Sequence, residues 1–135
     1  MREELARSPE LAEATPAEGQ ASAPATSLSK ELSRLAELSP EAAVMEAARR
    51  IEYRLAEILD DAGVPHRRIG LRGLARLAQE HGLIGDETLA AIEGMSVLRN
   101  LVAHVRGDIG VDRARDYLAL ADAVLYALRP KPSKG

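Results

Sequence analysis

Apolar residues recur at helical spacing along most of the chain. In an amphipathic helix, apolar positions three and four residues apart share one face. Ser39 and Pro40 are typical of a helix start, and Gly63 is typical of a helix end. No stretch carries a strong strand pattern, so the sequence predicts an all-α protein. Four segments carry the helical pattern: 39–62, 70–81, 86–104 and 112–129.

Short connections between these segments favour an antiparallel four-helix bundle with up-and-down topology. Four leucines before the first segment also have helical spacing and predict a fifth, short helix: Leu28, Leu32, Leu35 and Leu38. Residues 1–28 are rich in Ala, Pro, Ser and Glu without an apolar period, which predicts a disordered tail or linker. We therefore expect one domain over residues 29–135, with its core within 39–129.

The amino-acid composition limits which ligands the protein can bind. The 135 residues include 46% hydrophobic but only 2% aromatic residues, so the core must be built from Leu, Ala, Val and Ile, and stacking of many bases on aromatic rings is excluded. There is no cysteine, and the three histidines lack the short spacing of a metal site, so we expect neither a metal nor another cofactor. Residues 1–26 carry the whole net charge of −3, so residues 27–135 are neutral overall. Phosphate affinity would therefore need a local basic patch.

The chain contains no apolar run of the length of a membrane span and no apolar signal-peptide stretch near residue 1. These features predict a cytoplasmic protein that has no membrane partner.

The third helical segment carries the most informative polar residues. Ser96, Asn100 and His104 follow one another at four-residue intervals, which predicts one polar stripe. Arg99 precedes His104 by five residues, or about 140° around a helix, so the two do not share a face. They meet if the arginine bends around, if the helix end loosens, or if a second chain supplies one of them. Alternatively, Arg99 and His104 are solvated cations at a helix C-terminus.

The segment from Arg99 to His104 resembles the motif of an arginine, four residues and a histidine that marks the HEPN superfamily. Members of this superfamily are small bundles of four or five helices found in many prokaryotic defence and toxin systems. The place of the motif is also similar, because it ends the third long helix and precedes a short Gly-containing loop and a last amphipathic helix. The resemblance covers roughly Ser39 to Arg129.

The resemblance implies a metal-independent endoribonuclease that acts on RNA as a homodimer. Two copies of His104 would supply a base and an acid, Arg99 would hold the phosphate, and Asn100 would orient one of these groups. The resemblance is equally compatible with a noncatalytic module that dimerises or binds RNA or protein. It also implies an antitoxin or defence-protein partner. Many HEPN toxins carry a tyrosine for modification by a nucleotidyltransferase where this chain has Arg106, which we instead consider a candidate phosphate contact.

A second basic segment lies around the start of the second helical segment. Arg68, Arg72 and Arg76 follow one another at four-residue intervals, and Arg67 adds a further charge. No acidic residue lies among them in the sequence. They are candidates for binding an RNA phosphate backbone. The alternative is a solvated arginine face without a ligand.

Overall fold

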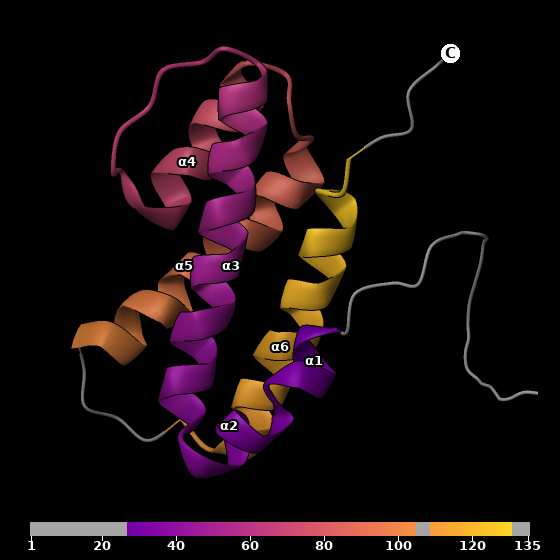
Figure 1. Ribbon diagram of the computed structural model, residues 1–135. Coiled ribbons are helices and arrows are strands. Elements are labelled where there is room, and N and C mark those ends of the chain that lie inside the picture. The colour runs from indigo at the N-terminus through magenta and orange to yellow at the C-terminus, as the bar shows by residue number, and fades with distance from the viewer. Residues whose placement is uncertain (1–26, 105–108, 131–135) are drawn as a thin grey trace, which may run out of the picture.

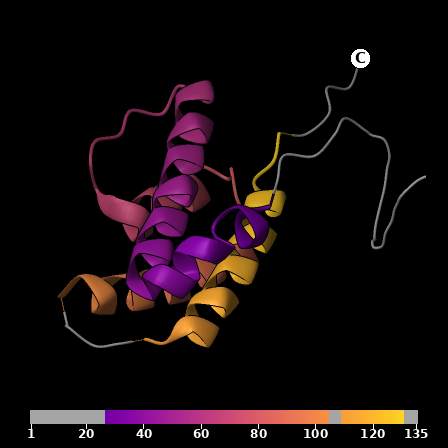
Figure 2. The same ribbon diagram turned by 60° about the horizontal axis from the view of Figure 1, so that its bottom comes forward.

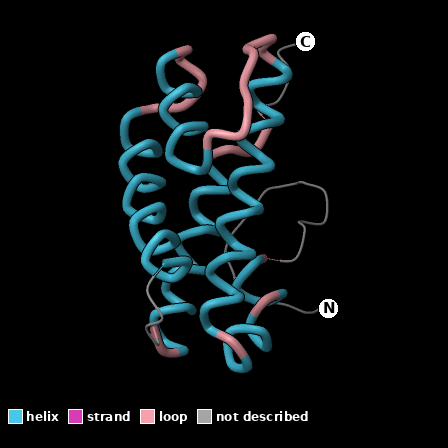
Figure 3. The backbone as a smooth tube through the Cα atoms, turned by 90° about the vertical axis from the view of Figure 1, so that its left-hand side faces the viewer, coloured by secondary structure: helices cyan, strands magenta, loops and turns pink. Residues whose placement is uncertain are grey.

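The computed structural model describes residues 27–104 and 109–130, and Figure 1 shows their arrangement. All regular structure in these residues is helical, and the tube in Figure 3 contains no strand there. The expected all-α helical bundle is therefore confirmed. The helices are α1 (Leu28–Glu31), α2 (Ser33–Leu38), α3 (Pro40–Asp61), α4 (Gly70–Glu80), α5 (Asp86–His104) and α6 (Val111–Ala127).

Helix α3 is the element on which the bundle is built, because α2, α4, α5 and α6 all pack against it. Its start follows the sequence signals: the Ser39 hydroxyl accepts a hydrogen bond from the Ala42 N–H at 3.2 Å, and Pro40 is the first helical residue. Its end is followed by Gly63 with φ +72°, a conformation that glycine adopts without strain. One face is fully buried, comprising Ala43, Val44, Ala47, Ala48, Ile51, Leu55 and Leu59.

The helix directions differ from simple alternation. Near the start of α3, Glu41 accepts a hydrogen bond from the Ile109 N–H just before α6 at 3.4 Å. Further along α3, the Arg54 Nε donates to the Leu128 carbonyl just after α6 at 2.7 Å. Helices α3 and α6 therefore run in the same direction.

Helix α4 also runs in the direction of α3. The connecting segment 62–69 returns along α3 before α4 begins, as Figures 1 and 3 show. An extended segment of this length spans up to about 29 Å, which is enough to return along most of the roughly 33 Å of α3. We expected successive helices to alternate in direction because the loops are short. This alternation holds only for α4, α5 and α6, since α5 runs opposite to its two neighbours.

The first two helices extend the domain beyond the predicted core. Asp122 on α6 accepts hydrogen bonds from the Leu28 N–H at 2.7 Å and from the Ser29 hydroxyl at 2.7 Å. Leu28, Leu32 and Ala36 are buried, and Figure 2 shows α1 and α2 in front of α3 and α6. Helix α1 therefore begins at Leu28, and buried residues of α1 and α2 join the core expected within 39–129. The remainder of the predicted tail, residues 1–26, lies outside the described residues.

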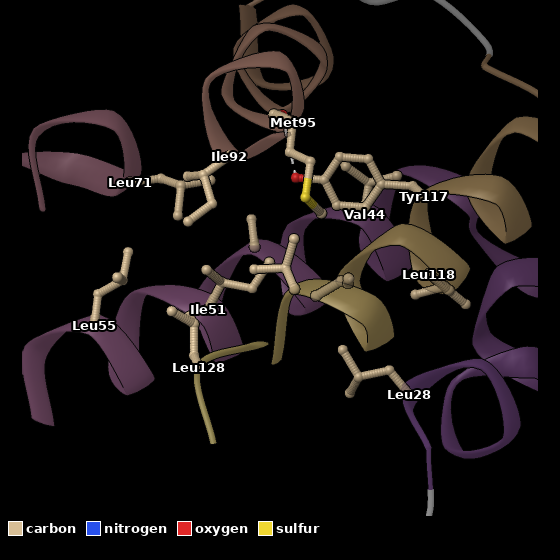
Figure 4. Packing of buried hydrophobic residues seen from close by; sticks show 14 of the residues in the cluster. Leu28, Val44, Ile51, Leu55, Leu71, Ile92, Met95, Tyr117, Leu118 and Leu128 are labelled. Atoms are coloured by element: carbon tan, nitrogen blue, oxygen red, sulfur yellow. Dashed lines mark hydrogen bonds between the residues drawn. The ribbon is translucent and has the colours of Figure 1, made fainter. Parts of the chain in front are cut away.

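The core contains a single aromatic side chain, Tyr117, and one polar contact that joins α5 to α6. The Tyr117 hydroxyl donates to the Met95 carbonyl at 3.2 Å, which Figure 4 marks with a dashed line. Burial raises the pKa of Tyr117 far above its usual value, although the positive charge of Arg99 opposes that shift. The hydroxyl therefore stays protonated, and remains a donor, throughout the physiological pH range.

None of the helices among the described residues has the length and apolar character needed to span a membrane.

Replacing a core leucine of α3 should destabilise the bundle much more than replacing an exposed leucine. Leu55 is fully buried, and Leu38 at the end of α2 is 76% exposed. We expect Leu55→Ala to lower the free energy of unfolding by about 2–5 kcal/mol, because it removes apolar contacts and leaves a cavity. The matched Leu38→Ala variant should change it by less than about 0.5 kcal/mol. Urea denaturation followed by circular dichroism measures both values, and equal losses would contradict this assignment of the core.

Candidate functional site

A pocket of about 690 Å³ opens between α3, the segment 62–69, the start of α4 and Arg99 of α5. Its lining is rich in arginine, with Arg49, Arg67, Arg68 and Arg99, and includes the one carboxylate of Glu52. We call it the arginine pocket. It combines Arg99 of the HEPN-like motif with Arg68 of the second basic segment, two candidates that lie far apart in the sequence.

Helix α3 forms one wall of the arginine pocket with the face opposite its buried stripe. Met45, Arg49, Tyr53 and Ala56 follow one another at helical spacing on that wall. The core needs only one face of α3, so these side chains are free to line a surface pocket. Tyr53 is 62% exposed and offers an aromatic ring at the pocket.

The guanidinium groups of the pocket have few acidic partners. Arg49 lies 3.5 Å from Glu46. Among the described residues, no carboxylate lies within ion-pair distance of Arg67, Arg68 or Arg99. Uncompensated cations in one concave site raise the local electrostatic potential and attract anions, although the chain as a whole is acidic.

The start of α4 adds a further positive element to the same pocket. Ile69 and Gly70 line the pocket, no side chain caps the helix, and its first turn contains no acidic residue. The N-terminus of a helix carries a partial positive charge and free N–H donors. In α3, by contrast, Ser39 and Glu41 compensate these groups.

Arg99 and His104 lie in different environments, as their spacing predicts. Arg99 is half-buried at the arginine pocket, and its Nη1 donates to the Asn100 Oδ1 at 3.3 Å. His104 is exposed at the end of α5 and does not line that pocket. Asn100 is exposed as well, and it lies between the two around the helix. One chain therefore does not bring Arg99 and His104 together.

The predicted polar stripe on α5 is not continuous. Ser96 is 4% exposed and belongs to the buried side, whereas Asn100 and His104 are exposed. Each step of four residues turns a helix by about 40° beyond a full circle, so two steps carry the stripe out of the core. Arg106, the candidate that follows His104, lies outside the described residues.

The outer side of α5 is unusually apolar for an exposed surface. Val97 is 58% exposed and Leu101 is 50% exposed, and with Leu120 of α6 they line a shallow pocket of about 370 Å³. A Cβ atom placed on Gly94 would meet no atom of the described residues within 4 Å, so none of them packs against this position. His104 follows Leu101 by three residues on the same side. We call Gly94, Val97, Leu101 and His104 the α5 face.

Two of the predicted phosphate ligands have an acidic partner after all. The Nε atom of Arg76 lies 2.8 Å from Glu93 on α5, and that of Arg72 lies 3.6 Å from the same carboxylate. No acidic residue lies among these arginines in the sequence, but antiparallel packing of α4 and α5 brings Glu93 to them. Arg68 instead lines the arginine pocket.

Sequence reasoning did not include Arg49, Glu52 and Tyr53 among the site residues. Their one signal was a second set of helically spaced residues on the outer face of α3. Such a pattern is normal for a solvated face, so only the return of segment 62–69 shows that they line a pocket.

No group of His, Asp or Glu side chains among the described residues is arranged to hold a metal ion. Comparison of the chain with protein-family models, with curated proteins and with solved structures finds no match. The fold and the site define an all-α bundle with an arginine pocket and an exposed apolar helix face.

The pairing of Glu93 with two arginines should be visible in its titration. A hydrogen bond from Arg76, together with the charges of Arg76 and Arg72, holds the pKa of Glu93 below its usual value of 4.5. A lowered pKa means that the pair stabilises the fold above the unfolded-state pKa and loses this effect as the pH falls through the folded-state value. We expect Arg76→Ala to raise the pKa of Glu93 toward 4.5, as measured by NMR of the carboxyl carbon.

Arg113→Ala is a matched control, since Arg113 is exposed on α6 and forms no ion pair among the described residues. An unchanged pKa of Glu93 in Arg76→Ala would contradict the pairing.

Proposed function

We propose that this protein is a HEPN-like, metal-independent endoribonuclease that acts as a homodimer through Arg99, Asn100 and His104. The observation that carries the proposal is the exposed apolar α5 face, which ends in His104. Val97 and Leu101 lose contact with water if two copies pair through this face. In a symmetric pair, the same surface of both copies forms the interface, and a twofold axis that passes near His104 brings the two His104 side chains toward one another.

Gly94 supports the same pairing. A glycine within a helix costs about 1 kcal/mol relative to alanine, and among the described residues no neighbour requires its small size. On the α5 face, a glycine permits the close approach of a second helix. A bundle of this size with few aromatic residues also gains stability from burying a further apolar surface.

The proposed reaction uses the RNA's own 2′-hydroxyl as the nucleophile. One His104 accepts the proton of this hydroxyl, and the oxygen attacks the adjacent phosphorus. The bond from phosphorus to the 5′-oxygen breaks, and the His104 of the second copy donates a proton to the leaving oxygen. The products are a 2′,3′-cyclic phosphate and a free 5′-hydroxyl. Arg99 stabilises the negative charge on the phosphate, and Asn100, which contacts Arg99, orients it.

One observation favours the alternative of a noncatalytic module. Within a single chain Arg99 and His104 are apart, so a copy that does not pair through the α5 face has no complete site. Such a protein would dimerise in another way or bind RNA or a protein partner without cleaving RNA. The partner classes that we consider are an antitoxin and a defence protein.

RNA cleavage tests the proposal directly. End-labelled single-stranded RNAs incubated with the purified protein in excess chelator should give discrete fragments that end in 2′,3′-cyclic phosphate. His104→Ala and Arg99→Ala should each lower the rate by about 10²-fold or more, because they remove the acid–base group and the phosphate ligand. His81→Ala is the matched control for the histidine variant, since His81 is an exposed residue after α4 and lies outside the proposed site.

Absence of cleavage by a folded dimer would favour the noncatalytic module, and equal cleavage by His104→Ala and His81→Ala would contradict the role of His104.

A further inference from the structure

The proposed reaction uses only Arg99 of the arginine pocket. Arg49, Arg67 and Arg68 have no part in it, although they approach the same cavity from α3 and from the segment 62–69. Like charges held close together repel one another, so such a cluster favours an anionic ligand.

We propose that the arginine pocket binds the phosphodiester backbone of single-stranded RNA beside the phosphate that is cleaved. This inference rests on the proposed function, because it assigns a strand subsite to the same substrate. The anion chemistry is that of phosphate: guanidinium groups donate paired hydrogen bonds to its oxygens. The uncapped start of α4 at Gly70 adds N–H donors and a positive partial charge, a combination that commonly binds phosphate.

The pocket also has a surface suited to the remainder of a nucleotide. Tyr53 and Ile69 are exposed large side chains at its lining, with exposed fractions of 62% and 41%. An exposed aromatic ring offers a stacking partner for a single base, and such contact tolerates any base. One tyrosine fits one unstacked nucleotide, in agreement with the scarcity of aromatic residues in the chain.

Arg99 connects this pocket with the α5 face. Arg99 lines the pocket, and its guanidinium contacts Asn100, which is exposed on the side of His104. Arg99 and His104 are separated by about 7.5 Å along the helix axis, because a helix rises about 1.5 Å per residue. Because the two residues also lie about 140° apart around the helix, a strand that wraps around α5 meets His104 at one phosphate and the arginine pocket several phosphates further on. A continuous strand fits this path better than a free nucleotide, which would occupy the pocket alone.

RNA binding without cleavage tests this subsite. His104→Ala serves as the background, and binding of a labelled single-stranded RNA is followed by fluorescence anisotropy at several salt concentrations. We expect Arg67→Glu with Arg68→Glu to weaken binding and to reduce the slope of log K against log salt by about 1.4, because each lost phosphate contact removes about 0.7 for a single strand. Both residues are exposed and lie outside the helices, so the fold should persist.

A double variant of equal charge change provides the control. Lys30→Glu with Arg34→Glu reverses two exposed cations on α1 and α2, which do not line the arginine pocket. Thermal unfolding confirms that both double variants are folded. Equal losses of RNA affinity in the two double variants would overturn the subsite, because bulk charge alone would then explain binding.

Two further outcomes separate the possible failures. If a nucleoside triphosphate binds the pocket as tightly as the RNA and displaces it fully, the pocket is a free-nucleotide site and the strand subsite is wrong. If pocket-dependent RNA binding is found but the wild-type protein cleaves no RNA, the nuclease proposal fails while the assignment of the pocket to the RNA backbone is supported.

Discussion

Burial of one face of α3 is the constraint on which the rest of the structure depends. This face contains alanines together with Val44, Ile51, Leu55 and Leu59, so the neighbouring helices can approach closely without large aromatic side chains between them. The packing occupies only one side of α3. The opposite side, with Arg49 and Tyr53, is therefore available to face the returning segment 62–69. The same helix thus organises the core and supplies a wall of the arginine pocket.

Helix α5 has one side buried in the core and one apolar side exposed to solvent. Ile92 and Met95 are buried in the core, and the hydrogen bond from Tyr117 to the Met95 carbonyl joins α5 to α6. With its inner side held in this way, the helix presents Val97 and Leu101 to solvent. Exposed apolar side chains that lie together on a helix are typical of an interface. This division explains why we assign Arg99 to a pocket within the chain and His104 to a contact between copies.

The sequence was sufficient to predict helices α3 to α6 and the aliphatic composition of the core, whereas the single short helix expected before them is divided into α1 and α2. Helical periodicity and signals such as Ser39, Pro40 and Gly63 depend on neighbours in the chain, so they can be interpreted locally. The spacing of Arg99 and His104 also correctly predicted that they occupy different faces.

Features that depend on contacts between distant segments were not predictable in this way. The return of segment 62–69 sets the direction of α4, and the packing of α4 on α5 brings Glu93 to Arg72 and Arg76. A sequence stripe likewise does not show where the core ends, so the burial of Ser96 was missed. The HEPN-like nuclease activity and the homodimer remain proposals that these helices and charges support.

Pairing of two copies through the α5 face is the central claim, and disulfide trapping tests it most directly. The natural chain has no cysteine, so a disulfide formed by Leu101→Cys must join two copies of the introduced residue. A disulfide requires Cα atoms within about 7 Å of one another, so a fast reaction at low protein concentration reports a specific approach. We predict rapid covalent dimerisation of Leu101→Cys and slow reaction of Leu38→Cys, whose site at the end of α2 is also exposed. Equally slow reaction of both variants would contradict the account.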